Sequence, residues 1–491
     1  MLKRLTALML VMIMLFSSVS VAFAAKKKKD AGPTAEPIPQ PTLSPDAPDY
    51  DPEHPENLSP DQLYALSAVL MTQDKGEVIF EKDPDEIRYP ASMTKIMTVL
   101  LALMLVDDLE ETVTVSETAV NVPPDSSTMY LKVDEEIRLI DVIYGTMLLS
   151  ANDGANVIAE AVSGDIPRFV DLMNRTAETL GCTNTHFVNP HGYHDDYHVS
   201  TARDMAIIAR EAMKNDVFRE VVSATSYQLP RTNKQRARSI TTKTEYMLMG
   251  SEENPNKYYY EYATGIKTGS HSRSGYCFAG AASKDGVDLI SVVMFTGKKA
   301  RWADTIKLMN YGFSQYTSLT PVDLYNMNPI KLPTSNYSTS DPDNGEISLI
   351  CIPKDEDVQI VTTKSDAKRM ADNLLDYVSF DFRGSLQAPI QAGEEIGTMT
   401  YYNDKGEPFV YSLTSSRSVE KLENAPKTID EIIAETYADP NPLPPFSFDL
   451  ALILFGPPLA LAGIIFFLVV SRKKRSGHKM RAPRPVNRYV K

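Results

Sequence analysis

The sequence predicts an α/β protein of the α+β type, in which one sheet is backed by a cluster of helices and a small all-β domain follows. Strand-like runs stand at both ends of a long folded region, and helical patterns fill its middle. Short alternating runs separated by turns come next. A stretch of 21 residues without charge then lies close to the C-terminus, and it predicts a transmembrane helix as the last element.

The composition is that of a globular protein with an uneven distribution of charge. Of the 491 residues, 43% are hydrophobic and 23% are charged, and the net charge is −14. The first 24 residues hold two basic residues and the last 21 hold nine, and neither end has an acidic one. The region between carries 39 basic and 64 acidic residues, so we expect no nucleic-acid partner. Three widely spaced cysteines predict buried thiols rather than a disulfide framework or a zinc site.

The first 60 residues are expected to lie outside the folded region. Residues 1–24 have the pattern of a secretory signal peptide, with a basic start, an apolar stretch and the small-residue site Ala22-Phe23-Ala24. A retained membrane anchor is the alternative, although the apolar stretch is short for a span. Both interpretations predict export. Residues 25–60 are a lysine cluster followed by many prolines, which predicts a disordered or extended spacer.

Residues 61–318 predict one domain. Strands at 65–71 and 76–81 begin it, and a helix that starts near Ser92 follows. This helix is apolar almost all round, so we expect it to be the buried centre of the domain. The other expected elements are helices at about 136–149, 153–163, 167–180, 201–214 and 301–316 and strands at 276–283 and 287–296. Strands at both ends predict one sheet built from the two ends of the domain.

Residues 319–424 predict the small all-β domain, because short runs alternate with Asp, Gly and Pro turns at 347–352, 358–363, 396–402 and 409–413. Proline- and acid-rich residues 425–447 predict a linker. Residues 448–470 contain the uncharged run and predict a single membrane crossing. The basic tail 471–491 follows at once, so the positive-inside rule places the C-terminus in the cytoplasm and the domains outside the cell membrane.

A serine and a lysine stand three residues apart at the start of the central helix. In Ser92-Met93-Thr94-Lys95, helical geometry puts both side chains on one face. A hydroxyl beside an amine makes a nucleophile with a base. The Ser-x-x-Lys pattern is shared by penicillin-binding proteins and class A β-lactamases, but alone it also fits an ordinary helix start.

Two further motifs follow in a fixed order. Ser150-Ala151-Asn152 lies at a helix–helix junction, where both polar side chains can point into one cleft. Lys267-Thr268-Gly269 precedes the last strands, and a glycine in a strand allows another backbone to approach closely. The three motifs are 58 and 117 residues apart, and their combination is far more specific than any of them alone.

With these motifs the chain resembles the low-molecular-mass penicillin-binding proteins that act as serine-type D-alanyl-D-alanine carboxypeptidases. Asn189-Pro190-His191-Gly192 and the segment 200–206 also look like blocks of that family, and the resemblance spans about 61–318. Residues 386–397 look like the family's C-terminal β-domain. The resemblance implies a β-lactamase/penicillin-binding-protein-like transpeptidase domain, with an antiparallel sheet flanked by helices and a helical subdomain.

The resemblance implies a mechanism of acyl transfer. Ser92 would attack the carbonyl of the penultimate D-alanine in a peptidoglycan stem peptide, and Lys95 would take its proton. A solvated lysine titrates near about 10.4, so burial and a nearby cation such as Lys267 would have to lower the pKa of Lys95. Ser150 would relay a proton to the leaving D-alanine.

The same resemblance implies the substrate-binding residues Asn152, Lys267, Thr268, Gly269 and Ser270. Asn152 would hold the substrate amide, and Lys267 with Thr268 would bind the terminal carboxylate. The backbone N–H groups of Ser92 and Ser270 would form the oxyanion hole. The segment 296–301 offers several candidates for an additional cation. No metal or cofactor is expected, and β-lactam antibiotics are expected as covalent inhibitors.

Three other functions are weighed against this one. A β-lactamase would need a second base for deacylation, and no Glu-x-x-Leu-Asn segment lies between the second and third motifs. A non-catalytic wall-binding protein that retains the fold is not favoured by three intact motifs. A metallopeptidase could use a cluster of metal-ligand types, but no His-Glu-x-x-His motif occurs. The residues of that cluster are His191, His194, Asp195, Asp196 and His198.

Overall fold

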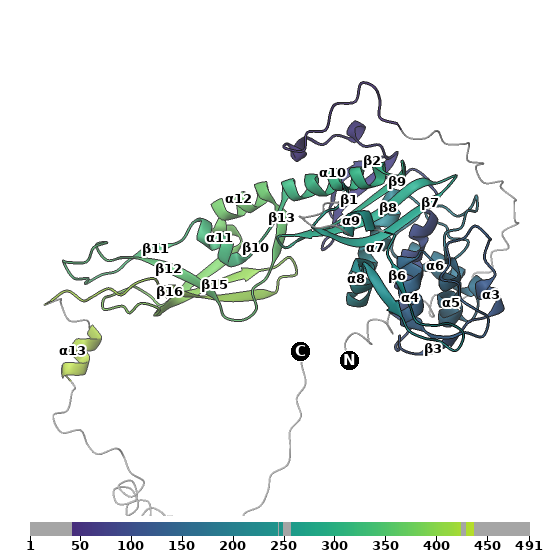
Figure 1. The fold of residues 1–491 in the computed structure, drawn as a ribbon. Helices are drawn as coiled ribbons and strands as arrows, with labels where there is room; N and C mark the ends of the chain where they lie inside the picture. Colours follow the sequence, from purple (N-terminus) through teal and green to yellow (C-terminus); the bar gives the residue numbers. More distant parts are fainter. Residues whose placement is uncertain (1–41, 244, 249–256, 424–428, 437–491) are drawn as a thin grey trace, which may run out of the picture. The chain divides into compact units, whose positions relative to one another are not determined.

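The computed structural model describes residues 42–243, 245–248, 257–423 and 429–436 (Figure 1). Contacts between Cα atoms divide the chain into two compact units, which are residues 1–332, 347–384 and 392–417 and residues 333–346, 385–391 and 418–491. Several predicted segments lie outside the described residues: the signal peptide 1–24, residues 25–41 of the spacer 25–60, much of the linker 425–447, the transmembrane helix 448–470 and the tail 471–491.

The first unit contains a five-stranded antiparallel sheet in the order β2-β1-β9-β8-β7. Its strands are β1 (Ser67–Thr72), β2 (Val78–Lys82), β7 (Ala263–His271), β8 (Gly275–Lys284) and β9 (Val287–Thr296). Strand β1, from the beginning of the domain, pairs with β9, from its end, and Val69 lies opposite Val292. The prediction of one sheet built from the two ends of the domain is therefore confirmed.

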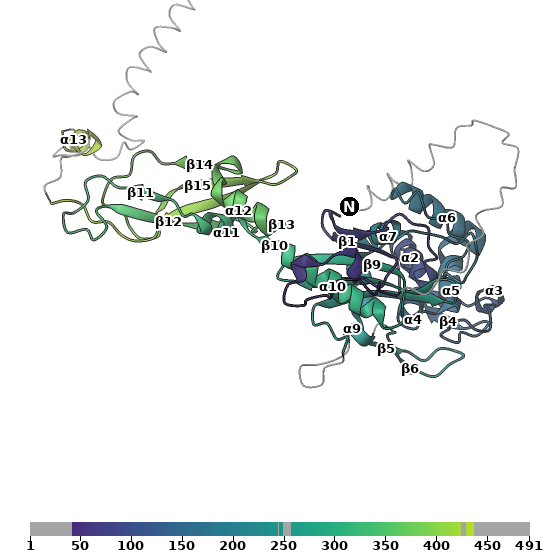
Figure 2. The same ribbon diagram turned by 90° about the horizontal axis from the view of Figure 1, so that it is seen from above.

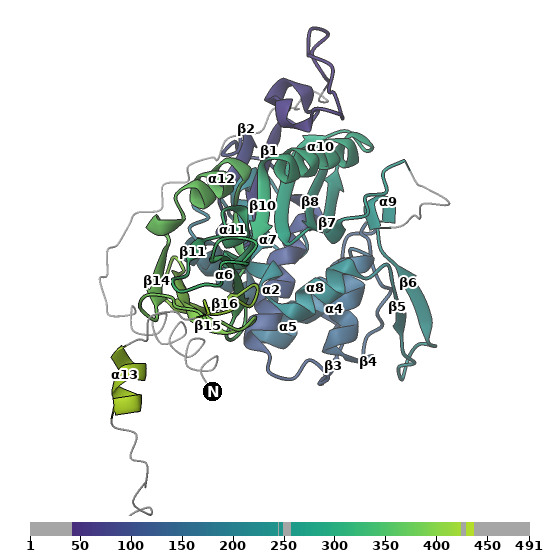
Figure 3. The ribbon, with the colours of Figure 1, turned by 90° about the vertical axis from the view of Figure 1, so that its left-hand side faces the viewer.

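Helices cover both faces of this sheet, as Figure 3 shows. Helix α10 (Ala300–Gln315) packs on one face, where Trp302 and Leu308 share a buried cluster with Phe278 and Leu289. The other face carries a larger group of helices and a larger core. The helices in this part of the chain are α2 (Lys95–Leu105), α3 (Glu117–Val120), α4 (Leu139–Leu148), α5 (Asn152–Ser163), α6 (Ile166–Thr179), α7 (Ala202–Met213), α8 (Asp216–Ser223) and α9 (Glu245–Leu248).

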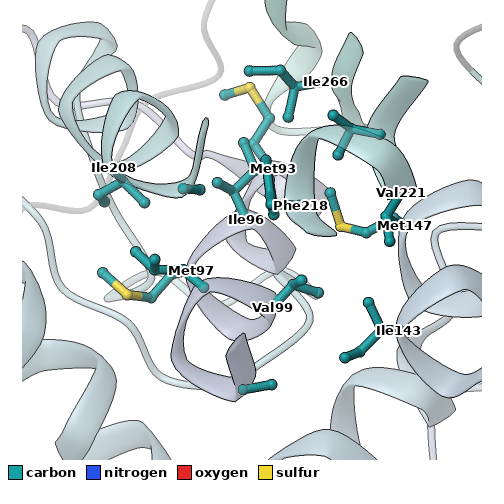
Figure 4. Packing of buried hydrophobic residues seen from close by; sticks show 14 of the residues in the cluster. Met93, Ile96, Met97, Val99, Ile143, Met147, Ile208, Phe218, Val221 and Ile266 are labelled. Atoms are coloured by element: carbon teal, nitrogen blue, oxygen red, sulfur yellow. The ribbon is translucent and has the colours of Figure 1, made fainter. Parts of the chain in front are cut away.

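Helix α2 is the centre of this helical group. Its first eight residues are all buried, and Figure 4 shows Ile96, Met97 and Val99 surrounded by side chains from neighbouring elements. The labelled neighbours are Ile143 and Met147 on α4, Ile208 on α7, Phe218 and Val221 on α8 and Ile266 on β7. The prediction that this helix is the buried centre of its domain is confirmed.

Two short strand pairs stand beside the helical group. Strand β3 (Thr112–Thr114) pairs with β4 (Glu136–Arg138), and β5 (Ser226–Leu229) pairs with β6 (Arg238–Thr241). Neither pair was predicted, because three- and four-residue strands in polar sequence give too little alternation to be recognised.

The first domain includes residues before the expected boundary at residue 61. Residues Pro55–Asn57 and Pro60–Gln62 form 3-10 helices, and Leu58 is buried in the core cluster beneath α10. The Gln62 side chain donates a hydrogen bond of 2.8 Å to the Asp49 carbonyl. The end of the segment expected to be a spacer thus packs on the domain, because Leu58 supplies the apolar contact that its prolines lack.

The β-rich domain lies within residues 316–417. A five-stranded sheet has the order β11-β12-β16-β15-β14, and β10 pairs with β13. The strands are β10 (Tyr316–Leu319), β11 (Lys331–Pro333), β12 (Glu346–Pro353), β13 (Ile360–Thr363), β14 (Val378–Phe382), β15 (Glu395–Tyr402) and β16 (Pro408–Ser415). The predicted β domain is confirmed. It also has helices that were not predicted, α11 (Pro321–Met327), α12 (Lys364–Asp372) and the 3-10 helix Leu374–Asp376.

The second unit consists of short segments joined by backbone hydrogen bonds. Ser335 N donates to the Leu386 carbonyl, and Ile390 and Val419 exchange hydrogen bonds. It also includes helix α13 (Ile429–Thr436), which lies within the predicted linker and is visible in Figure 2. Among the residues that the structure describes, no helix is both long enough and apolar enough to cross a membrane.

Candidate active site

Ser92 lies in a single turn of 3-10 helix, Ala91–Thr94, immediately before α2. The prediction of a serine in the first turn of one continuous helix is therefore correct in position but not in helix type. Ala91 has a left-handed φ of 48°, which sets this turn apart from the α-helix that follows. Thr94 Oγ1 donates a hydrogen bond of 2.8 Å to the Ala91 carbonyl and holds the turn closed.

Two glycines allow neighbouring chain segments to approach this turn. A Cβ atom on Gly192, whose φ is 78°, would lie 1.8 Å from the Ala91 carbonyl oxygen. A Cβ atom on Gly269 would lie 2.7 Å from the Pro90 carbonyl oxygen. The prediction that Gly269 lets another backbone approach closely is confirmed, and the turn that carries Ser92 is fixed between two backbones.

Lys95 is fully buried and contacts the serine hydroxyl. Its Nζ lies 3.1 Å from Ser92 Oγ, 2.8 Å from Asn152 Oδ1 and 2.6 Å from the His191 carbonyl oxygen. Burial lowers the pKa of Lys95 well below its usual value, and the positive charge of Lys243 lowers it further. In the neutral amine, two hydrogens are taken by the two amide oxygens, and the lone pair remains for the Ser92 hydroxyl.

Asn152 begins α5 and connects Lys95 to the opposite wall. Its amide nitrogen donates a hydrogen bond of 3.0 Å to Ser126 Oγ, while its oxygen accepts from Lys95. The next residue, Asp153, accepts hydrogen bonds from the backbone N–H groups of Met129 and Leu131. The start of α5 therefore fixes both the Lys95 amine and the loop 125–131 that faces it.

Ser150 lies two residues before Asn152, at the end of α4. It is buried, and its φ of 61° is left-handed. In the described part of the chain, no hydrogen bond joins its hydroxyl to Ser92 or Lys95. The structure thus brings Ser150 to the same helix junction as Asn152.

The third motif lies on β7, the edge strand of the sheet. Lys267 and Thr268 are buried, and Lys267 Nζ donates a hydrogen bond of 3.1 Å to the Thr268 carbonyl. Burial lowers the pKa of Lys267 well below its usual value, and the nearby amine of Lys95 adds to this effect. Ser270, the next residue but one, is exposed.

These segments enclose an open cavity of about 420 Å³. Predicted site residues Ser92, Asn152 and Ser270 line it. The remaining lining residues are Asp125, Ser126, Ser127, Gly192, Tyr193, His194, His271 and Ser272. The three motifs therefore meet around one groove, with the lysines beneath its surface.

Sequence reasoning missed one cation of the site. Lys243 Nζ donates a hydrogen bond of 2.7 Å to Ser127 Oγ on the cavity wall, and its charge lowers the pKa of both Lys95 and Lys267. The cation expected from the sequence, Lys267, is buried more deeply than Lys243. No motif marks Lys243 in its polar sequence, so only the tertiary structure reveals it. Within the segment 296–301, Arg301 is buried and its guanidinium stacks on Tyr276 and Trp302.

Two of the three histidines of the metallopeptidase alternative, His191 and His198, are engaged in hydrogen bonds within the protein. His198 Nδ1 accepts from the backbone N–H of Val188, and His198 Nε2 contacts Thr94 Oγ1 at 2.8 Å. His191 Nδ1 accepts from the backbone N–H of Tyr193. In the part of the chain that the structure describes, no group of three or more His, Cys, Asp or Glu side chains is arranged to hold a metal ion.

Comparison with known proteins agrees with this geometry. Residues 54–297 match the family model of D-alanyl-D-alanine carboxypeptidases, and residues 345–421 match that of the penicillin-binding protein 5 C-terminal domain. The D-alanyl-D-alanine carboxypeptidase DacF of Bacillus subtilis is 30% identical over 351 residues, which are 69% of this chain and 82% of that protein. DacA of Escherichia coli K12 is 30% identical over 357 residues, 70% of this chain and 80% of that protein.

Among solved structures, the crystal structure of the Streptomyces K15 DD-transpeptidase is 30% identical and covers 52% of this chain and 99% of that one, with a TM-score of 0.48. The antiparallel sheet, the flanking helices and the bonded Ser92–Lys95 pair define a serine enzyme of the penicillin-binding class. Within that class, the chain belongs to the D-alanyl-D-alanine carboxypeptidase family, whose low-molecular-mass members it matches over both domains.

Proposed function

We propose that this chain removes the terminal D-alanine from peptidoglycan stem pentapeptides through an acyl-enzyme on Ser92. Membership of the family supports a serine D-alanyl-D-alanine carboxypeptidase that acts in cell-wall metabolism. The observation that carries the proposal to the level of residues is the buried Lys95 amine, 3.1 Å from the Ser92 hydroxyl and bonded to two amide-type oxygens.

Acylation begins with the neutral Lys95 amine. Ser92 Oγ bonds to the carbonyl carbon of the penultimate D-alanine while its proton passes to Lys95 Nζ. The backbone N–H groups of Ser92 and Ser270 stabilise the negative oxygen that forms, a contribution of about 3–4 kcal/mol per donor in comparable enzymes. Asn152 keeps the amine oriented and binds the substrate amide.

The peptide C–N bond then breaks, and the terminal D-alanine leaves as an amine that takes a proton through Ser150. The carboxylate of the leaving residue is bound by Lys267 and Thr268, a cation beside a hydroxyl, on β7 next to Gly269 and Ser270. Water attacks the ester carbonyl, the proton returns to Ser92 Oγ, and the shortened stem peptide is released.

The same site is proposed to react with β-lactam antibiotics, whose strained amide presents a carbonyl to Ser92. Because the amine of a ring-opened β-lactam stays attached to the acyl group, the ester persists longer than that of the peptide. This property makes a fluorescent penicillin a direct measure of Ser92 reactivity.

We further propose that the enzyme is exported by residues 1–24 and held in the cell membrane by residues 448–470, with its catalytic domain outside. Support comes from the sequence: an apolar stretch before Ala22-Phe23-Ala24, and 21 uncharged residues before a basic tail. Protease accessibility in intact cells tests this orientation. Protection of the catalytic domain and cleavage of the tail would contradict it.

The test of the proposed function is the substitution Ser92→Ala. It should abolish both labelling by a fluorescent penicillin and, by mass spectrometry, loss of one alanine from a pentapeptide. Ser272→Ala, at another serine of the same cavity, is the matched control and should retain both activities. A folded Ser92→Ala protein that still becomes labelled would remove Ser92 from its role.

A further inference from the structure

A strongly basic hairpin stands beside the cavity. Residues 226–243, which include β5 and β6, contain five basic side chains and no acidic one. The region between the two chain ends, by contrast, has 39 basic and 64 acidic residues. Figure 3 shows this hairpin extending outward at the edge of the domain. Such a concentration of one charge on an otherwise acidic protein indicates attraction of an anionic partner.

The hairpin is joined to the rim of the cavity by a row of hydrogen bonds. Lys243 Nζ donates to Ser127 Oγ at 2.7 Å, and Arg238 Nη2 donates to the Met129 carbonyl at 2.9 Å. Gln235 Nε2 then donates to the Tyr130 carbonyl at 3.0 Å. The second strand of the hairpin therefore follows the segment 127–130, which starts in the cavity wall and leads away from it.

The outer end of this row presents charged and aromatic side chains to solvent. Arg231, Lys234 and Arg236 are exposed, and none forms an ion pair within the described residues. Tyr130 is 73% exposed, and its backbone has a left-handed φ of 61°. An exposed aromatic ring beside free cations is a combination that suits a carbohydrate bearing carboxylates, since the ring stacks on a sugar and the cations attract the acids.

Three of the acidic groups that face the hairpin lie in the adjacent turn, and another, Asp141 on α4, accepts a hydrogen bond of 2.7 Å from the Tyr227 hydroxyl. Glu135 is buried, and its carboxylate accepts hydrogen bonds from Thr232 and Gln235. Asn233 bonds the Asp134 carbonyl and the Glu136 backbone N–H, so these two acids flank the tip. The structure records no salt bridge from Asp134 or Glu136 to the hairpin within its described residues, so the three basic side chains remain available.

We propose that residues 226–243 and Tyr130 form a secondary binding surface for polymeric peptidoglycan, which holds the glycan strand and the carboxylates of its stem peptides while one stem occupies the cavity. This inference rests on the proposed function. The cavity of about 420 Å³ has room for the end of one stem peptide. The segment 238–243 has an extended length of roughly 17 Å and connects the cavity wall to the basic tip of the hairpin, a reach that a free pentapeptide does not need but a polymer can use.

The experiment compares two substrates of the full-length enzyme in detergent. One is a free pentapeptide ending in D-alanyl-D-alanine, and the other is soluble glycan strands that carry the same pentapeptide. The triple variant Arg231→Gln, Lys234→Gln and Arg236→Gln should keep the kcat/KM of the free pentapeptide. On glycan strands it should lose about tenfold in kcat/KM, through KM, and most of the wild-type salt dependence.

A matched control removes three other exposed cations of the same domain, Arg168→Gln, Arg175→Gln and Lys214→Gln, none of which lines the cavity. This variant should act on both substrates like the wild type. Tyr130→Ala should weaken action on glycan strands without changing the salt dependence, since it removes stacking and no charge.

Three results would overturn the inference. One is an equal loss on both substrates in the basic-hairpin variant, which would indicate a structural role. Another is an unchanged kcat/KM on glycan strands. The third is that the hairpin charges govern binding to anionic phospholipid vesicles and not to glycan strands, which would identify a membrane-facing surface. If the free pentapeptide is not cleaved by the wild type, the proposed function fails instead, and the substrate comparison distinguishes the two failures.

Discussion

At the scale of single residues, the chemistry of the site depends on the protonation state of the buried Lys95 amine. Lys95 has three oxygen neighbours, and two of them can only accept hydrogen bonds. A neutral amine satisfies both and still offers its lone pair to Ser92. A charged amine would have to remain in a fully buried position, which is why burial lowers the pKa of Lys95 so strongly.

The first residue-scale prediction concerns Lys243. Its positive charge lowers the pKa of Lys95, so Lys243→Met should raise that pKa and make less neutral amine available at low pH. The acylation rate rises with pH as Lys95 loses its proton. The variant's rising limb should therefore move to higher pH, as measured by penicillin acylation across the pH range. Lys243→Arg retains the charge and should leave the rising limb at the wild-type pH. If the limb lay at the same pH in the wild type and in both variants, this role of Lys243 would be contradicted.

A second prediction concerns His198, whose pKa burial lowers to about 3. Val188 N–H donates to Nδ1, so Nε2 carries the hydrogen and donates to Thr94, which in turn donates to the Ala91 carbonyl. Below the unfolded pKa of about 6.5, the unfolded chain takes up a proton that the folded ring refuses. The contribution of His198 to the free energy of unfolding is therefore fully present above that pH, and it falls as the pH decreases toward 3.

As the pH falls from 6.5 to 5, protonation of His198 in the unfolded chain should lower the free energy of unfolding by roughly 2 kcal/mol. His198→Gln can still accept from Val188 and donate to Thr94 but does not titrate, so its urea-unfolding free energy should depend less on pH by about that amount. His54→Gln, at an exposed side chain, serves as the comparison. A pH dependence identical to that of the wild type would exclude His198 as the source.

At the scale of elements, the site is a turn between two backbones. The 3-10 helix that carries Ser92 has β7 on one side and the loop around Gly192 on the other. Since both contacts are made by main chain, the backbone position of Ser92 follows the positions of the sheet edge and of that loop.

Gly269→Ala tests that arrangement. The new methyl group would lie 2.7 Å from the Pro90 carbonyl oxygen and 3.3 Å from Ala91 Cβ, so β7 and the turn must separate. We expect a loss of about 1–3 kcal/mol in stability and of about tenfold or more in acylation, because small displacements of reacting groups are costly. Gly297→Ala is the control, since its methyl would meet only Ala300 Cβ at 3.4 Å. Equal acylation rates in the two variants would show that β7 does not position Ser92.

Elements with strong periodicity or extended apolar runs could be predicted from the sequence, and those defined by tertiary contacts could not. Helices α4 to α7 and strands β8 and β9 occur within a few residues of the expected ranges. The buried cysteines were also predicted, and all three are free and buried. The left-handed residues Ala91 and Ser150 were not, because nothing in an L-amino-acid sequence marks strain that the surrounding fold imposes.

The candidate site shows the same division. Ser92, Lys95 and Asn152 could be found because each belongs to a short motif, and the structure joins them by hydrogen bonds. The roles of Lys243 and His198 could not be predicted, since Lys243 acts electrostatically on Lys95 and His198 is hydrogen-bonded to Thr94, and each pair is about 100 to 150 positions apart in sequence. A motif describes residues that are near in sequence, whereas electrostatic effects depend on separation in space.

At the scale of the whole molecule, function is divided along the chain. Every proposed catalytic and substrate-binding residue lies between positions 92 and 270, while the predicted membrane span begins at 448. Deleting residues 448–491 should therefore release the enzyme from membranes and leave the rate of penicillin acylation within about twofold of the full-length value. The physical reason is that none of the proposed site residues lies in the deleted segment. Ultracentrifugation of cell extracts, followed by fluorescent labelling of pellet and supernatant, measures both effects at once.

The same deletion combined with Ser92→Ala should be soluble and unlabelled, which separates release from activity. A truncated protein that is folded and soluble but not acylated would show that the C-terminal segment contributes to the site, and one that remains in the pellet would place the anchor elsewhere in the chain.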